Sequence, residues 1–256
     1  ARILVDGLPL QHYGIELEGE NRVTCWIPSE AGKRFSIFWQ DLLQYRICYQ
    51  TGDIRVDGVS CRSKILGPVG ANCTVEERYF HTSPTTGRPF VFSNLQHTDD
   101  DAYLRSAPGE LGEIVLSIWP VRIVGEAAHR RIQPRQNQIV HERAKKSYSH
   151  CVAFGNDVAL PFTRSLMTER MSAAPFATFV FKYRPLERLI ADGIAPPPPS
   201  PRPNKRPFSD MSGGSGDEAA RRVQALTERV KQLEAELKDH KRARTEAADE
   251  IIDLTA

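Results

Sequence analysis

Three stretches of the 256-residue chain carry residue types that support chemistry in other proteins. Asp99-Asp100-Asp101 could offer carboxylate oxygens to a cation, but these acids equally suit the first turn of a short helix that Thr98 caps. Gly32-Lys33 is not part of a phosphate-binding loop, because Arg34 follows where Ser or Thr is needed. His141-Glu142 lacks the second histidine of a zinc-protease helix. We therefore interpret the acidic run as structural, and expect a non-enzymatic protein without a bound metal or cofactor.

The cysteines and the basic residues form no pattern typical of a metal or nucleic-acid site. Five cysteines, an odd number, include no C-x-x-C pair, so we expect reduced and mostly buried thiols. Residues 129–150 hold six Lys or Arg against one Glu and could touch phosphates. Only Tyr148 is available there for base stacking, and the net charge of the chain is +2. We interpret this stretch as a solvated loop and expect no nucleic-acid partner.

The last eight residues, 249–256, combine acidic and apolar side chains in a short cluster. Ile251, Ile252 and Leu254 supply the apolar groups, while Asp253 and the acids before Ile251 supply negative charge. The cluster resembles a SUMO-interacting motif, which adds an extended strand to the edge of the modifier's sheet and sets its acids against a basic rim. A chance match is the alternative, because motifs this short recur by chance. We predict binding to SUMO or SUMO-modified proteins.

Basic clusters near the C-terminus predict where in the cell the protein is located. Lys241, Arg242 and Arg244 match the short basic pattern of a nuclear import signal, and Lys205 with Arg206 adds a basic pair. Charged flanks of a helix explain part of this pattern. No stretch approaches the roughly 18 apolar residues of a membrane span, and the opening residues do not match a signal peptide. We therefore expect no membrane association and a nuclear protein, with the cytoplasm as the alternative.

Residues 217–248 have the heptad pattern of a coiled coil. The acidic pair at 217–218 suits the start of a helix, and five apolar residues follow at steps of three and four: Val223, Leu226, Val230, Leu233 and Leu237. The apolar seam covers about two heptads, so we predict a weak homodimer. A lone solvated helix, or one folded back on the rest of the chain, is the alternative.

The preceding residues divide into a linker and a β-rich domain. Residues 196–216 begin with four prolines and end in a Gly/Ser run, which is typical of a disordered spacer. Residues 1–195 contain short alternating apolar runs between turn residues, such as Asp57-Gly58. We predict strands at 3–5, 23–27, 34–39, 55–56, 59–66, 88–95, 113–124, 148–152 and 177–183. This set favours a mainly β fold, an antiparallel sandwich or barrel-like domain, with short helices at 98–104, 138–146 and 185–192.

Several longer strings in residues 1–195 are specific enough to indicate a family. They include residues 23–33 (VTCWIPSEAGK), 81–93, 140–143 and 177–186 (ATFVFKYRPL). These strings resemble an uncharacterised family of mushroom-forming (basidiomycete) fungi, known only as a domain of unknown function. The resemblance implies a shared fold and no known activity.

Two functions follow as hypotheses. The first is a nuclear adaptor, self-associating through its coiled coil and binding SUMO through its C-terminus, whose β-domain holds a protein partner. The alternative is a carbohydrate- or peptide-binding β-sandwich with an incidental tail. Exposed aromatic side chains such as Trp26, Trp39 or Trp119 on one face would favour the alternative, and burial of all three would oppose it.

Overall fold

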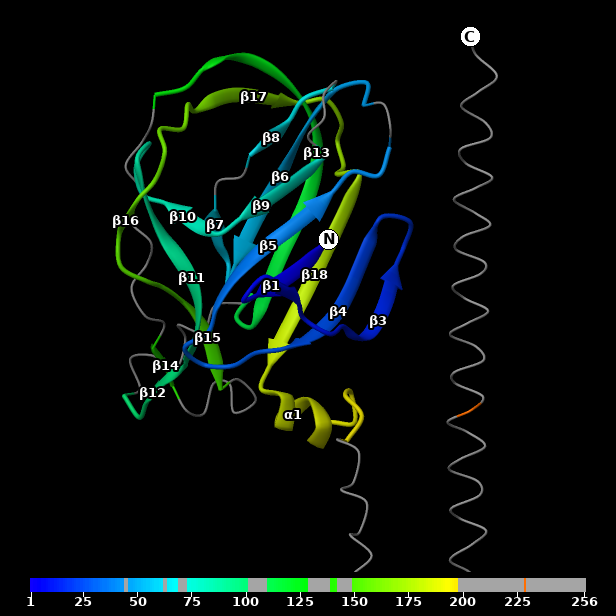
Figure 1. Ribbon diagram of the computed structural model, residues 1–256, viewed down its shortest axis with the longest axis vertical. Coiled ribbons are helices and arrows are strands. Elements are labelled where there is room, and N and C mark those ends of the chain that lie inside the picture. The colour runs from blue at the N-terminus through cyan, green and yellow to red at the C-terminus, as the bar shows by residue number, and fades with distance from the viewer. Residues whose placement is uncertain are drawn as a thin grey trace, which may run out of the picture. The chain divides into compact units, whose positions relative to one another are not determined.

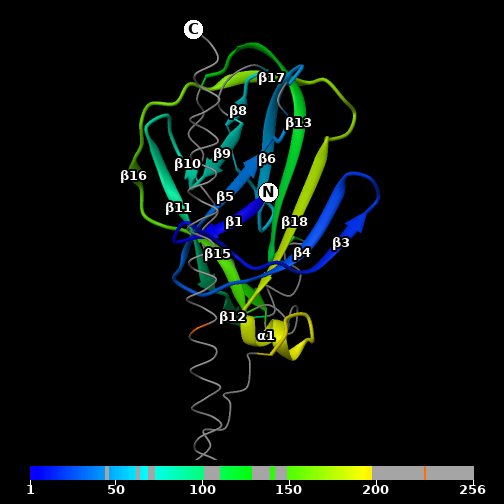
Figure 2. The same ribbon diagram turned by 45° about the vertical axis from the view of Figure 1, so that its right-hand side comes forward.

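The structure, a computed structural model, describes residues 1–43, 46–61, 64–68, 73–100, 110–128, 139–141, 149–197 and 228 (Figures 1 and 2). The chain divides into two units, Ala1–Pro199 and Ser200–Ala256. The described part of the first unit is mainly β-structure in two large sheets, with one short helix.

The first sheet has the strand order β10 (Tyr79–His81), β11 (Thr86–Asn94), β5 (Arg34–Gln40), β1 (Arg2–Val5), β2 (Leu8–Pro9). Strands β15 (His150–Phe154) and β16 (Val158–Ala159) also pair with β11, and β9 (Thr74–Glu77) pairs with β5. All of these pairings are antiparallel.

The second sheet has the order β3 (Tyr13–Glu18), β4 (Arg22–Pro28), β18 (Ala177–Arg184), β13 (Glu113–Glu126), β6 (Tyr49–Val56), β7 (Val59–Cys61). Strand β17 (Leu166–Arg170) pairs with the curved end of β13, and β8 (Ile65–Leu66) pairs with β6 (Figure 1). A separate parallel pair joins β12 (Gln96–Thr98) to β14 (Ile139–His141).

Alternation of side chains along the strands creates one core between the two sheets. In β13, Ile114, Leu116 and Ile118 are buried in that core, as their period-two spacing predicts. Phe92 of β11 and Tyr183 of β18 meet across the sheets, with ring centroids 5.2 Å apart. These aromatic side chains contribute much of the apolar area that holds the sheets together.

The Asp-Gly turns form the hairpins that their sequence predicts. Asp57-Gly58 joins β6 to β7, and Asp6-Gly7 joins β1 to β2. All four residues have positive φ, between 48° and 80°. This is the type I′ geometry that closes a two-residue hairpin, and it favours Asp followed by Gly.

Several expectations are confirmed and others are wrong. The domain has two sheets, as a sandwich requires, but they do not close into a barrel. The pairing is not wholly antiparallel, because β18 runs parallel to β4. The closing helix is confirmed as α1 (Leu186–Ala191).

The helix predicted at 138–146 is wrong where the structure describes it, since β14 lies there. Its β-branched Ile139 and Val140 pair with β12. Thr98 ends a strand, although its Oγ1 accepts the backbone N–H of Asp100 at 3.2 Å, as a cap would. The rest of the helix predicted at 98–104 lies outside the described residues from residue 101 onward. Among the described residues, no helix has the length and apolar character of a membrane span.

Candidate functional site

The tail residues singled out by their sequence lie outside the described part of the chain. These are the SUMO-motif residues Ile251, Ile252, Asp253 and Leu254, the basic residues Lys205, Arg206, Lys241, Arg242 and Arg244, and the seam residues Val223, Leu226, Val230, Leu233 and Leu237. Most of the basic stretch 129–150 also lies outside. The functional geometry therefore comes from the β-domain.

The thiols follow the expectation from sequence. All five cysteines are free, and Cys25, Cys61 and Cys151 are buried. Burial raises the pKa of Cys25 and of Cys151 to about 11. It also raises the pKa of Cys61, to which the carboxylates of Glu77 and Asp53 add. These groups therefore stay protonated and unreactive near neutral pH.

One serine–histidine pair has the contact that nucleophilic catalysis uses. Ser29 Oγ lies 2.8 Å from His150 Nδ1, and burial lowers the pKa of His150 while the charge of Glu187 opposes that effect. Ser29 is only 6% exposed, so its hydroxyl is largely shielded from solvent. The pair fastens the end of β4 to the start of β15.

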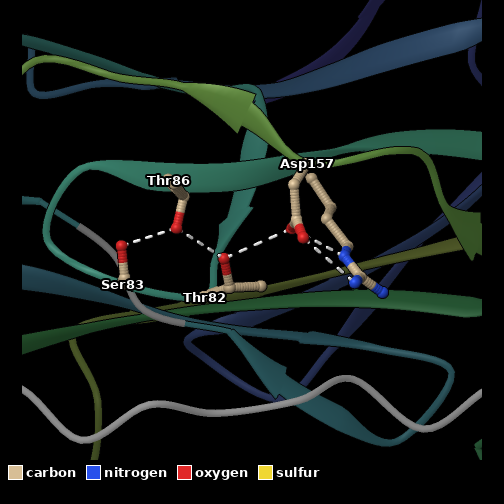
Figure 3. A network of polar contacts seen from close by, with 5 residues as sticks. Thr82, Ser83, Thr86 and Asp157 are labelled. Atoms are coloured by element: carbon tan, nitrogen blue, oxygen red, sulfur yellow. Dashed lines mark hydrogen bonds and ion pairs between the residues drawn. The ribbon is translucent and has the colours of Figure 1, made fainter.

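A second polar cluster surrounds the loop between β10 and β11 (Figure 3). Thr86 Oγ1 contacts Thr82 Oγ1 at 2.9 Å and Ser83 Oγ at 2.5 Å. The Asp157 carboxylate accepts hydrogen bonds from Arg88 Nε at 2.8 Å and from Thr82 Oγ1 at 3.5 Å. The carboxylate is thus held by a guanidinium. These contacts join the loop and β11 to the segment before β16.

A buried carboxylate lies where the two sheets meet. Asp57 is 3% exposed and accepts hydrogen bonds from the Tyr183 hydroxyl at 2.7 Å, from Gly112 N at 2.8 Å and from Val152 N at 2.7 Å. Burial raises its pKa to about 6, while these hydrogen bonds act in the opposite direction. With no solvent access, Asp57 serves the fold and not a ligand.

An open polar pocket lies on the outer face of the second sheet. The cavity has a volume of about 220 Å³ and is lined by Thr51, Gly52, Asp53, Cys61, Trp119, Val121, Thr168 and Arg170. Arg170 Nη2 donates to Asp53 Oδ2 at 2.9 Å, and its guanidinium carbon lies 3.8 Å from the centre of the Trp119 ring. The Asp53 and Arg170 side chains are 36% and 54% exposed, so solutes can reach the pocket.

Strand register explains why these side chains share one face. Trp119 pairs directly with Thr51, and Ser117 with Asp53. Paired residues in neighbouring strands point to the same side of a sheet. The core residue Ile118 lies between Ser117 and Trp119 on the other side. Strand β17 brings Arg170 opposite Val121 and completes the pocket.

The three tryptophans have different environments. Trp39 is buried, at 2% exposure, whereas Trp119 and Trp26 are half-buried on the outer face of the second sheet. A guanidinium covers each outer-face ring, since Arg184 lies 4.6 Å from the centre of Trp26. The condition that all three be buried, which would oppose a binding face, is therefore not met.

Two further histidines lie on short strands of the domain, His81 on β10 and His97 on β12. His81 Nε2 lies 3.6 Å from Glu77 Oε2, and His97 is exposed in β12. The described residues contain no group of three or more His, Cys, Asp or Glu with the geometry of a metal site.

Sequence reasoning did not identify Asp53, Thr168 or Arg170. Alternation along β6 could have placed Thr51 and Asp53 on one face. No sequence signal relates Asp53 to Arg170, which is 117 residues away.

Comparison with curated proteins and with solved structures found no match. A family model described as a domain of unknown function, DUF7918, matches residues 1–198. That match covers both sheets, the closing helix and the outer-face pocket. The chain therefore belongs to the DUF7918 family.

Proposed function

We propose that this chain is a non-enzymatic interaction protein, an adaptor whose β-domain binds a partner and whose tail engages SUMO-modified proteins. The observation that supports binding over catalysis is the contrast between its polar sites. Ser29 with His150, and the Asp57 carboxylate, are buried in contacts that stabilise the fold. The solvent-accessible pocket at Asp53 and Arg170 presents hydrogen-bonding groups, and its one thiol, Cys61, stays protonated.

The tail supplies the rest of the proposal. Residues 200–256 are the second of the two units into which the chain divides, and the hook is proposed from their sequence. Ile251, Ile252 and Leu254 would dock along the sheet edge of SUMO, and Asp253 would face its basic rim. The basic residues Lys241, Arg242 and Arg244, with Lys205 and Arg206, would direct the chain to the nucleus. The family strings at 23–33 and 177–186 also support an origin in mushroom-forming fungi.

A pull-down of the full chain on immobilised SUMO tests the hook. Ile251→Ala with Ile252→Ala should abolish retention, because these side chains would fill the apolar groove. The matched control is Lys241→Ala with Arg242→Ala and Arg244→Ala, which should retain SUMO binding but move a tagged chain from nucleus to cytoplasm. Retention of the double isoleucine variant at the wild-type level would remove SUMO from the proposal.

A carbohydrate- or peptide-binding module is the second candidate function. The outer-face pocket favours it, because Trp119 and a bridged Asp–Arg pair line a cavity open to solvent. Arrays of oligosaccharides and of peptides probed with the full chain test this candidate. Binding to neither array would exclude it.

A further inference from the structure

The outer-face pocket lies against β6, next to its described pairings with β7 and β8. Strand β7 pairs with residues Ile54 to Val56, and β8 pairs with Gln50 and Thr51. Gly52 and Asp53 lie between these two pairings, and both line the pocket.

The charges of the described residues that line the pocket balance. Its lining contains one carboxylate, Asp53, and one guanidinium, Arg170, joined by an ion pair. An anionic ligand would compete with Asp53 for Arg170, and a cation would be repelled by Arg170. A ligand without net charge keeps the ion pair and can still use both groups, if it offers donors and acceptors together.

The other lining groups fit hydroxyl recognition with an apolar component. Thr51 and Thr168 supply hydroxyls that both donate and accept. The Trp119 indole nitrogen is buried and has no hydrogen-bond partner among the described residues. Tyr49, 37% exposed, lies two residues before Thr51 on the same face of β6, although it does not line the pocket itself.

We propose that this pocket is a binding subsite for one neutral sugar ring. Adjacent hydroxyls would donate to Asp53 and accept from Arg170, and the C–H face of the ring would pack on Tyr49. The volume of about 220 Å³ lies below the roughly 300–1,000 Å³ of sites for drug-sized ligands, which suits a single ring. This inference rests on the second candidate function and gives it a site and a ligand class.

Saturation-transfer NMR on the full chain tests the subsite with glucose, galactose, mannose and N-acetylglucosamine as probes. Glucuronic acid and glucosamine serve as charged counterparts. At least one neutral sugar should receive saturation. Arg170→Ala and Asp53→Asn should each weaken its binding by about tenfold or more, as expected for loss of a charged hydrogen-bonding partner.

Arg122→Ala is the matched control, because Arg122 forms an exposed ion pair with Glu169 between the same two strands. This pair lies one residue along from the Arg170–Val121 pair and so faces the other side of the sheet. The Arg122→Ala variant should bind the sugar as tightly as the wild type does. Thermal unfolding of every variant shows whether a loss of binding reflects a loss of fold.

The remaining outcomes distinguish failure of the proposed subsite from failure of the carbohydrate-binding function. Sugar binding that Arg170→Ala and Asp53→Asn leave unchanged would place the ligand elsewhere while keeping a carbohydrate module. If peptides bind on the arrays and Arg170→Ala abolishes that binding, the pocket is a binding site, but the proposal that its ligand is a sugar is overturned. Preference for a charged counterpart, or saturation of none of the four neutral sugars, would overturn the proposal.

Discussion

Asp57 is the residue on which a hairpin turn and both sheets converge. Its backbone forms the β6–β7 turn, and its carboxylate reaches Val152 in β15 of the first sheet and Tyr183 in β18 of the second. A buried carboxylate is tolerated only where hydrogen bonds replace its water. The donors that converge on Asp57 meet this requirement and fix the turn relative to both sheets.

Replacing Asp57 by Asn should destabilise the domain. The amide nitrogen would face the N–H of Gly112 or of Val152, donor against donor, although the Tyr183 hydroxyl could turn to accept. One unsatisfied buried group costs about 1–3 kcal/mol, so the unfolding free energy from urea titration should fall by about that amount at pH 7.

The matched control for that substitution is Asp6→Asn. Asp6 occupies the equivalent turn position with φ 52°, but its carboxylate is exposed and paired with Lys33 at 3.1 Å. This change should stay within about 0.5 kcal/mol of the wild type. Equal losses in the two variants would contradict a special role for the buried carboxylate.

The protonation of Asp57 should make stability depend on pH. Burial raises its pKa from 3.8 to about 6 in the folded chain, so the folded state holds its proton more tightly than the unfolded state. The unfolding free energy contributed by this group should therefore fall as pH rises from about 4 to 6, by up to about 3 kcal/mol.

Urea titrations at several pH values, on the wild type and on Asp57→Asn, isolate this contribution. The unfolding free energy of the wild type minus that of Asp57→Asn should decrease as pH rises from 4 to 6, since Asn does not titrate. A difference that stays constant with pH would show that another group controls this range.

At the scale of single elements, the outer face of the second sheet combines rigidity with access. Strand β13 pairs with β6 and β18 along its first part and with β17 along its curved end. Trp119 pairs with Thr51 of β6 and lies between the part of β13 that pairs with β18 and the part that pairs with β17. On the other edge of β6, the described partners are β7 and β8. The pocket forms where β6, β13 and β17 bring Asp53, Trp119 and Arg170 together.

The predicted coiled-coil element carries a prediction of its own. Leu226→Asp with Leu233→Asp places charges in the apolar seam, so dimerisation of the full chain should weaken by about 100-fold or more. Sedimentation equilibrium should then give the 28.8 kDa monomer at concentrations where the wild type dimerises.

Gln224→Asp with Gln232→Asp is the control, because it adds the same charge outside the seam. This variant should sediment as the wild type does. A wild-type chain that is monomeric at every concentration would refute self-association through this element.

At the scale of the whole molecule, the two units suggest a division of roles. The β-domain would bind its ligand at one pocket, and the tail would add a SUMO hook and a weak dimer contact. Each contact alone would be weak. Pairing two chains raises the effective concentration of the second hook and the second pocket, so avidity can exceed single-site affinity by about 10²–10⁴. An adaptor built this way would respond to clustered and not to isolated targets.

Local features of the domain could be predicted from the order of its amino acids. Period-two alternation predicted β13 and its buried face, Asp57-Gly58 predicted a hairpin, and Pro185 with Gly193 predicted the closing helix α1. These features depend on residues within a few positions of each other, so local propensity decides them. The sequence also supplied every expectation about the tail, and each of those expectations stays a prediction.

Contacts between segments far apart in the chain could not be predicted and are visible in the folded domain alone. It paired β18 with β4 in parallel and brought Arg170 to Asp53 across 117 residues, and Tyr183 to Asp57 across 126. Sequence patterns do not encode such contacts, because the free energy that selects them comes from filling one shared core and satisfying its buried polar groups. The candidate site is a consequence of that packing, which explains why no motif marked it.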